Sequence, residues 1–204
     1  MADLLQSVLR GLIQAGMYAA YRPKIKYDNP AVMDGEEPCV FICNHMSHKD
    51  GALIASVLHK KKPYFLIAKD WYEQKRYGVF LRRYGSIPVD REGMDTGWFD
   101  ACKKQIEAGH SILIFPEGRT SKEEMREFQP GFAVLAEKTG APVVEVTQAG
   151  NYKLFFGERK KLRIGDSYRL ECPKELRKSQ YAKQVAAEAR TRMIKRKSKL
   201  EIRN

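Results

Sequence analysis

The sequence contains no long uninterrupted apolar segment. A membrane-spanning helix requires about 18 or more apolar residues in a row, and no stretch of the 204 residues reaches that length. The N-terminus also lacks the basic segment and the cleavage pattern of a secretory signal peptide. We therefore expect no transmembrane helix and no export through a signal peptide.

Cysteine is too sparse and too irregularly spaced to form a disulfide framework. Its four copies, Cys39, Cys43, Cys102 and Cys172, are separated by unequal gaps and include no C-x-x-C pair. Such usage is typical of reduced thiols in a cytoplasmic protein. We expect these residues to act as small apolar core side chains.

Histidine is equally scarce, which argues against a metal centre. Two of the four histidines fall at the ends of predicted helices, so a metal site would have to use His45, His48 and Asp50. We expect no metal ion. A serine hydrolase is also disfavoured because the sequence has no G-x-S-x-G nucleophile elbow. Ser47 remains an alternative nucleophile.

Negative charge is depleted in the last quarter of the chain. From residue 153 to residue 204 there are 17 Lys and Arg against 6 Asp and Glu, so this quarter carries +11 of the formal net charge of +12. It is either a solvated helix face or a surface that attracts a polyanion, such as nucleic acid or the anionic cytoplasmic leaflet. No nucleic-acid-binding module accompanies it. We expect an anionic membrane surface as partner and no nucleic acid.

The N-terminus has the pattern of an amphipathic helix. Its apolar residues recur at helical spacing, and they are Leu4, Leu5, Val8, Leu9, Leu12, Ile13 and Met17. Such a helix either packs on the domain or lies in a membrane interface, and both alternatives stay open. We assign residues 1–22 to this helix and residues 23–204 to one domain.

The remaining pattern predicts an α/β fold. Short apolar runs that read as strands alternate with helical segments, which is typical of a mostly parallel central sheet flanked by helices. The expected strands are 39–43, 64–68, 86–90, 111–115 and 143–147, with one or two more within 161–170. The expected helices include one or two over 71–84, then 96–108, 132–139 and a basic helix over 181–200. Residues 21–38 read as a polar connector.

The most informative motif follows the first of these strands, at Asn44-His45-Met46-Ser47-His48-Lys49-Asp50. An imidazole can remove a proton from a hydroxyl at neutral pH, and a carboxylate that accepts a hydrogen bond from its other nitrogen fixes the tautomer. We interpret His45 as a general base and Asp50 as its partner. A purely structural His45 is the alternative.

A second motif, Phe115-Pro116-Glu117-Gly118-Arg119-Thr120, follows the clearest strand. Glycine lets a ligand approach the backbone, and a guanidinium binds phosphate with two parallel hydrogen bonds. The segment from Glu117 to Thr120 therefore reads as an anion clamp, to which Arg91, at the end of another strand, adds a second positive charge. An ordinary surface ion pair between Arg119 and Glu117 is the alternative.

The order of these motifs is more specific than any one of them. Four blocks, 44–50, 85–91, 115–119 and 141–144, resemble the ordered blocks of the glycerolipid acyltransferase family, whose best-known members are the 1-acylglycerol-3-phosphate acyltransferases. The resemblance spans roughly residues 38–170. It implies an α/β acyltransferase fold, an acyl-CoA or acyl-carrier-protein donor, direct transfer to the acceptor, and no metal or organic cofactor.

The resemblance also implies a role for each motif residue. His45 is the base and Asp50 its partner, while the acceptor's glycerol phosphate is bound by Arg91, Glu117, Gly118 and Arg119.

Three positions depart from the usual family pattern. Residues 117–121 read Glu-Gly-Arg-Thr-Ser where many members have Glu-Gly-Thr-Arg-Ser, Gln129 replaces a basic residue, and Glu145 stands where a second proline is usual. These departures leave the base intact and leave the acceptor open.

We therefore expect an acyltransferase that moves a fatty acyl group to the hydroxyl of a lysophospholipid. The expected acceptor is 1-acylglycerol 3-phosphate, which gives phosphatidic acid, and the expected location is the cytoplasmic face of a membrane. Glycerol 3-phosphate, another lysolipid or a phosphate-free alcohol are alternative acceptors. A non-catalytic basic protein that binds membrane or nucleic acid is the alternative of another class.

Overall fold

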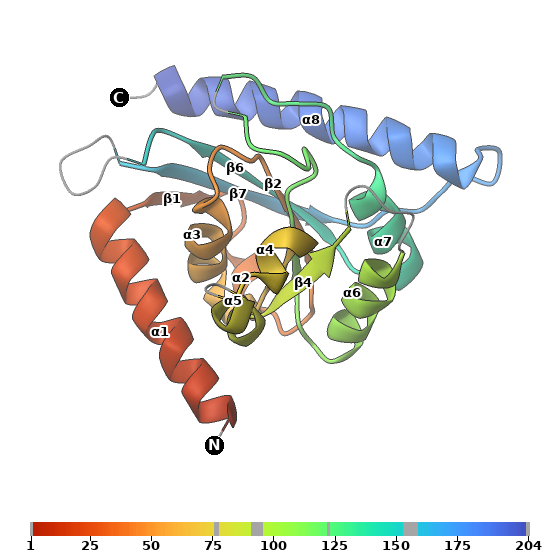
Figure 1. Ribbon diagram of the computed structural model, residues 1–204. Helices are drawn as coiled ribbons and strands as arrows, with labels where there is room; N and C mark the ends of the chain where they lie inside the picture. The colour runs from red at the N-terminus through yellow and green to blue at the C-terminus, as the bar shows by residue number, and fades with distance from the viewer. Residues whose placement is uncertain (1, 76–77, 91–95, 122, 153–158, 203–204) are drawn as a thin grey trace.

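The computed structural model describes residues 2–75, 78–90, 96–121, 123–152 and 159–202, and in them one seven-stranded sheet lies between two layers of helices (Figure 1). The strand order is β1-β7-β6-β2-β5-β3-β4. All neighbouring strands are parallel except β6 and β7. The strands are β1 (Lys24–Tyr27), β2 (Val40–Cys43), β3 (Tyr64–Ala68), β4 (Ser86–Val89), β5 (Ile112–Ile114), β6 (Val143–Ala149) and β7 (Lys161–Tyr168).

The helices cover both faces of this sheet. They are α1 (Ala2–Tyr21), α2 (Ala31–Asp34), α3 (Asp50–Val57), α4 (Lys69–Glu73), α5 (Gly78–Tyr84), α6 (Gly97–Glu107), α7 (Gly131–Thr139) and α8 (Lys178–Ile202), with a 3-10 turn η1 (His59–Lys61). The core on one face includes residues of α6, α7 and α8, and the core on the other includes residues of α2 and α3. The long helix α8 lies along one side of the molecule, and α1 slants away at the opposite side (Figure 1).

Strand β2 shows why the central strands are apolar throughout. Val40 and Ile42 belong to the core on the α8 side, whereas Phe41 and Cys43 belong to the core on the α3 side. Because successive side chains of a strand point to opposite faces, a strand covered on both sides must be apolar at every position. The predicted single-domain α/β fold with a mixed, mostly parallel sheet is confirmed.

The prediction of a polar connector over residues 21–38 is wrong. That segment contains β1, which pairs in parallel with β7 at the edge of the sheet, and the one-turn helix α2. Only Ile25 of β1 packs against the core, while the flanking Lys24 and Lys26 are exposed. An edge strand with one inward apolar side chain has too little apolar content to be distinguished from a loop.

Helix α1 ends at Tyr21, one residue before the predicted end at residue 22, and packs against α3 and α5. Ile13 and Tyr18 contact the core, whereas Val8 and Leu12 are 51% and 67% exposed. Part of the apolar stripe is therefore used for packing, and part of it faces outward. Among the described residues, no helix combines the length and the apolar content needed to cross a membrane.

The cysteines largely follow the expectation of apolar core side chains. Cys39, Cys43 and Cys102 are buried free thiols, and Cys172 is partly exposed. Burial raises the pKa of Cys102 to about 12, because a thiolate is poorly solvated in an apolar environment. Three of the four thiols are therefore held in their neutral form by the core.

Glu145, the residue that replaces a usual proline, fastens α8 to the sheet. Its carboxylate is 1% exposed, and it accepts hydrogen bonds from Arg192 Nε at 2.9 Å, from the Tyr168 hydroxyl at 3.1 Å and from Arg196. Arg196 reaches Glu145 across Gly165, where a Cβ atom would lie 3.1 Å from its guanidinium. The departure from the family pattern thus has a structural role.

We expect Glu145→Gln to lower the free energy of unfolding by about 2 kcal/mol, because it removes the charge that neutralises two partly buried guanidinium groups. Glu188→Gln is the matched control, since Glu188 lies 3.9 Å from Arg192 and is exposed. Exposed pairs contribute about 0–1 kcal/mol. Urea unfolding measures both variants, and equal midpoints would show that Glu145 does not anchor α8.

Candidate active site

The two motifs meet at one edge of the sheet. His45 follows β2 and the 115–121 loop follows β5, and these strands are parallel neighbours, so both segments emerge at the same end. The Ser121 N–H donates to the His45 carbonyl at 2.7 Å. The Phe115 ring stacks on the His45 ring, with centroids 4.4 Å apart. The sheet therefore assembles the site beyond the carboxyl ends of its strands, as α/β folds commonly do.

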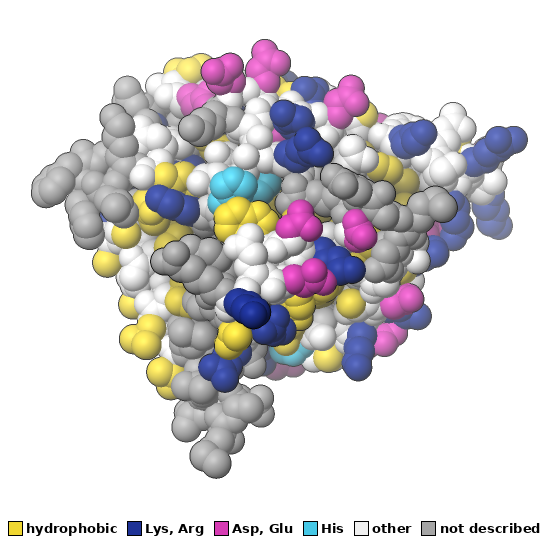
Figure 2. Space-filling model, in the orientation of Figure 1, with side chains coloured by type: hydrophobic (Ala, Val, Ile, Leu, Met, Phe, Trp, Pro, Cys, Tyr) yellow, Lys and Arg dark blue, Asp and Glu magenta, His cyan; other side chains and the backbone are white. Residues whose placement is uncertain are grey.

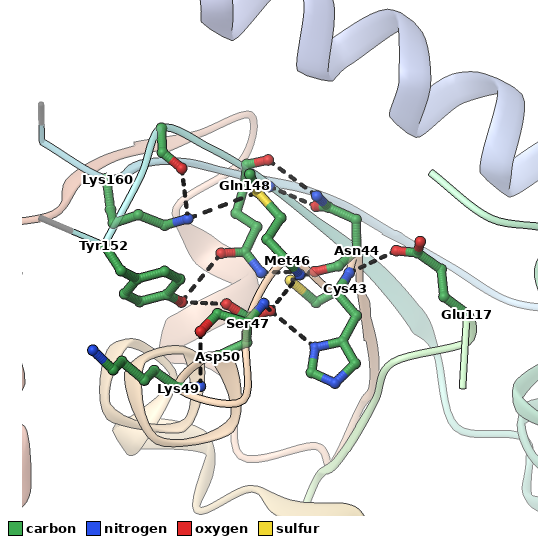
Figure 3. A network of polar contacts seen from close by, with 12 residues as sticks. Cys43, Asn44, Met46, Ser47, Lys49, Asp50, Glu117, Gln148, Tyr152 and Lys160 are labelled. Atoms are coloured by element: carbon green, nitrogen blue, oxygen red, sulfur yellow. Dashed lines mark hydrogen bonds and ion pairs between the residues drawn. The ribbon is translucent and has the colours of Figure 1, made fainter. Parts of the chain in front are cut away.

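Asp50 is the centre of the polar network (Figure 3). Its side chain has no exposed surface. One carboxylate oxygen, Oδ2, lies 2.9 Å from His45 Nδ1 and accepts the N–H groups of Met46 at 2.6 Å and Ser47 at 2.8 Å. The other oxygen, Oδ1, accepts the hydroxyl of Tyr152. The carboxylate therefore holds the whole 45–47 turn as well as the imidazole.

This arrangement fixes which nitrogen of the His45 imidazole carries the proton. A carboxylate can only accept hydrogen bonds, so His45 Nδ1 must carry a proton and Nε2 must carry the lone pair of the neutral ring. Within the described part of the chain no residue forms a hydrogen bond with Nε2, and the side chain is 17% exposed. His45 is thus oriented as a base whose accepting nitrogen is available to a ligand.

Tyr152 and Lys160 join this network, and no sequence motif pointed to either of them. Burial, followed by the charge and the hydrogen bond of Asp50, raises the pKa of Tyr152 well above its usual range, so the phenol stays a proton donor. The Lys160 ammonium lies 4.3 Å from the centre of the Tyr152 ring and donates to the Gly150 carbonyl at 3.1 Å. Lys160 has no exposed surface. Only the position of Tyr152 just beyond a strand end was a usable signal.

Asn44 joins the end of β2 to the end of β6. Its amide donates to the Gln148 carbonyl at 3.1 Å and accepts the Gln148 N–H at 2.8 Å, while the Gln148 side chain donates to the Asn44 carbonyl at 2.7 Å. Both residues are buried. These bonds continue the β2–β6 pairing to the residue before His45 and so fix where the base emerges.

Glu117 links the two motifs directly. Its Oε1 accepts the His45 N–H at 2.6 Å and its Oε2 accepts the Arg126 N–H at 2.8 Å. Burial raises the pKa of Glu117, although both backbone donors act in the opposite direction. Both oxygens are therefore engaged in holding the loop beside His45, and a direct contact of Glu117 with an acceptor stays a prediction.

The rest of the predicted anion clamp lies in an exposed turn. Gly118 has φ of +68°, a left-handed conformation that favours glycine. Arg119 is exposed and Thr120 is half-buried. The alternative ion pair between Arg119 and Glu117 is not formed, and within the described ranges Arg119 has no ion pair at all. Arg91 lies outside the described residues.

Among the described residues, the contacts of Ser47 and His48 do not support a serine nucleophile or a metal site. Ser47 Oγ accepts the Lys49 N–H at 3.3 Å, and no contact between described residues joins it to the His45 ring. The His48 ring lies against Trp71, with centroids 5.5 Å apart. No three His, Cys, Asp or Glu side chains gather as metal ligands in the parts of the chain that the structure describes.

The surface on this side of the molecule is mixed in character. Figure 2 shows histidine side chains in the middle of this face beside a group of hydrophobic side chains, with Asp or Glu and Lys or Arg side chains around them. An oriented base beside an exposed guanidinium suits the hydroxyl of a phosphate-bearing alcohol.

A protein-family model described as Acyltransferase matches residues 24–148, which is more than half of the sequence. The chain belongs to this acyltransferase family. The match includes His45, Asp50 and the residues of the exposed turn, and it ends before Tyr152, Lys160 and α8.

Individual proteins of this family resemble the chain over different lengths. It is 31% identical over 125 residues to the chloroplastic 1-acyl-sn-glycerol-3-phosphate acyltransferase BAT2 of Brassica napus, covering 58% of this chain and 35% of that protein. It is 24% identical over 148 residues to the 1-acyl-sn-glycerol-3-phosphate acyltransferase of Bacillus subtilis, covering 71% of this chain and 74% of that protein. The matched region is thus about a third of the plant protein and about three quarters of the bacterial one.

A solved structure shares the fold. The crystal structure of the 1-acyl-sn-glycerophosphate (LPA) acyltransferase PlsC from Thermotoga maritima aligns with a TM-score of 0.68 at 15% identity. The alignment covers 96% of this chain and 81% of that one. The likeness extends beyond the family match to nearly the whole chain, including the N-terminal and C-terminal parts.

We expect Tyr152→Phe to lower kcat about tenfold with little change in KM, because Asp50 loses a hydrogen bond worth about 1.5 kcal/mol and orients His45 less well. Tyr21→Phe is the matched control, since Tyr21 meets the Tyr152 ring edge to face at 5.1 Å. Steady-state acyl transfer measures both variants. Equal kcat values in the two would contradict the positioning role of Tyr152.

Proposed function

We propose that the protein is an O-acyltransferase that moves a fatty acyl group from a thioester donor to the hydroxyl of a lysophospholipid. The observation that carries this proposal is the His45–Asp50 pair, at 2.9 Å, in which His45 keeps a partly exposed side chain and its Nε2 has no hydrogen-bond partner among the described residues. Membership of the acyltransferase family supports the same chemistry. The donor is acyl-CoA or acyl-carrier protein, and both are acidic enough to suit a basic protein.

The residues of the site account for each proton in the reaction. As the acceptor oxygen attacks the thioester carbonyl carbon, its proton moves to His45 Nε2, and Asp50 stabilises the resulting imidazolium. The tetrahedral intermediate then collapses, the carbon–sulfur bond breaks, and the leaving thiolate takes the proton from Nε2. The products are an ester and a free thiol, and the neutral imidazole is restored without a covalent acyl-enzyme.

The exposed turn supports a phosphate-bearing acceptor. Arg119 is held near His45 because Glu117 and Ser121, on either side of it, both bond to the His45 backbone. Relatives from Brassica napus and Bacillus subtilis carry the name 1-acyl-sn-glycerol-3-phosphate acyltransferase. We therefore propose 1-acylglycerol 3-phosphate as the acceptor and phosphatidic acid as the product, in phospholipid biosynthesis. Glycerol 3-phosphate, another lysolipid and a phosphate-free alcohol remain the alternatives.

We propose that the enzyme works as a peripheral protein at the cytoplasmic face of a membrane. The exposed Val8 and Leu12 of α1 offer apolar side chains for insertion, and the formal net charge of +12 offers attraction to anionic lipid.

We expect His45→Ala to lower kcat/KM for acyl transfer about 10³-fold, because the general base is removed. Transfer to lysophosphatidic acid is measured with the purified protein in detergent or liposomes, and circular dichroism and vesicle binding serve as controls for folding. Turnover that survives the substitution would sink the catalytic assignment. It would favour the alternative of a non-catalytic basic binding protein.

We expect Arg119→Ala to raise KM for lysophosphatidic acid about 10- to 100-fold, because a charge-assisted hydrogen bond to phosphate is lost. Arg119→Lys should raise the KM for lysophosphatidic acid by a smaller factor. Neither substitution should change the KM for a phosphate-free monoacylglycerol. A matrix of donors and acceptors measures these values. If the wild-type protein acylates only phosphate-free alcohols, the assignment of the turn to phosphate binding is wrong.

A further inference from the structure

A basic groove lies between the edge of the sheet and the end of α8, and it is separate from the His45 site. Its cavity has a volume of about 680 Å³. We call it the β1–β7 groove, and it is lined by Lys24, Lys26, Lys161, Leu162, Arg163, Lys199, Leu200 and Ile202. Of these described lining residues five are cationic and none is acidic. The lysines of β1 had no part in the sequence-based argument.

The register of the two strands brings these cations together. Lys24 is paired with Lys161 and Lys26 with Arg163, so four cations occupy directly opposed positions on one face. Ile25 and Leu162, which alternate with them, pack in the core on the other face. Like charges directly opposite each other on a sheet are destabilising. Asp28 offsets one of them, through an ion pair with Arg163 at 2.7 Å.

The groove is also apolar at one side. Leu200 and Ile202 come from the end of α8, and Ile202 is 80% exposed. Leu200 is buried, so the exposed apolar side chain beside the cations is that of Ile202. A concave site of this kind suits a ligand that carries a phosphate and an acyl chain. None of the described lining residues is aromatic, so the groove has no platform on which nucleic-acid bases could stack.

The groove faces the same end of the molecule as the active site. Lys161 directly follows Lys160, whose ammonium contacts the Tyr152 ring of the Asp50 network. The two lysines point to opposite faces of the sheet. A membrane that delivers an acceptor to His45 would therefore also lie near the groove.

We propose that the β1–β7 groove binds the phosphate headgroup of an anionic phospholipid and so docks the protein on the membrane beside its active site. The occupant is a lipid of the surface and not a reacting molecule, so this proposal adds to the proposed function and does not depend on turnover. In this proposal, anionic lipid binds at one defined site, which includes two lysines from β1. The C-terminal quarter does not act only through a diffuse attraction to the lipid surface.

The test compares two variants that remove the same charge. Lys24→Gln/Lys26→Gln changes the groove, and Lys174→Gln/Lys183→Gln changes two exposed cations at the start of α8 or just before it. Flotation with vesicles of phosphatidylcholine, alone or with added phosphatidylglycerol, measures binding. We expect the groove variant to lose about 30-fold in affinity for the anionic vesicles, and the control variant to lose far less.

Two further measurements distinguish loss of the lipid site from loss of activity or of folding. The groove variant should keep the wild-type turnover of short-chain soluble substrates in detergent, and His45→Ala should keep wild-type vesicle binding. Removing opposed like charges should leave the Tm of the groove variant unchanged or raise it, which excludes unfolding as the cause of any loss.

Several outcomes would overturn the proposal. Equal losses in the two variants would show that the attraction is diffuse. Inorganic phosphate could raise the Tm of the wild-type protein but not that of the groove variant, while both proteins bind vesicles equally. That result would show that the groove is a site for a soluble anion. If the groove variant binds vesicles normally but no longer binds acidic carrier protein, the groove is a protein-docking surface.

Discussion

The buried carboxylate of Asp50 is the constraint on which the site depends. A charge without exposed surface is costly unless hydrogen bonds replace its water. Asp50 meets that requirement with four donors, from the His45 ring, the backbone of the next two residues, and Tyr152. The same bonds shape the 45–47 turn and select the tautomer of His45. The His45 ring cannot move away without leaving Asp50 short of a hydrogen-bond donor, so the bonds that fold the turn also orient the ring.

Part of the positive charge of the C-terminal quarter has a structural use that its composition does not suggest. Arg192 and Arg196 bind the buried Glu145, and Arg190 donates to the carbonyls of Met125 and Arg126 in the segment that Glu117 also holds. Helix α8 thus buttresses the loop that carries Arg119. Net charge alone could not reveal this, because it does not distinguish cations with internal partners from those available to a membrane.

Sequence reasoning succeeded where the signal is local. The central strands were predictable because burial on both faces makes them continuously apolar, and the contact between His45 and Asp50 was predictable because they are five residues apart at a strand end. Sequence reasoning failed where the contacting residues or strands are far apart in the sequence. Tyr152 meets Asp50 across 102 residues, and β1 is a strand only because β7 arrives beside it. Neither contact leaves a periodic pattern that one sequence can show.

The exchanged order of Arg119 and Thr120 is explained by where strand β5 ends. In a strand, moving a guanidinium by one position would turn it to the opposite face, but β5 ends at Ile114 and Gly118 has a left-handed conformation. Arg119 therefore follows a turn whose position is fixed by Glu117 and Ser121 and not by strand alternation. A partly exposed His45, held by a buried Asp50, therefore lies beside an exposed turn. In the function proposed above, the chemistry would depend on Asp50, and the choice of alcohol would depend on side chains of the turn that can change without disturbing Asp50.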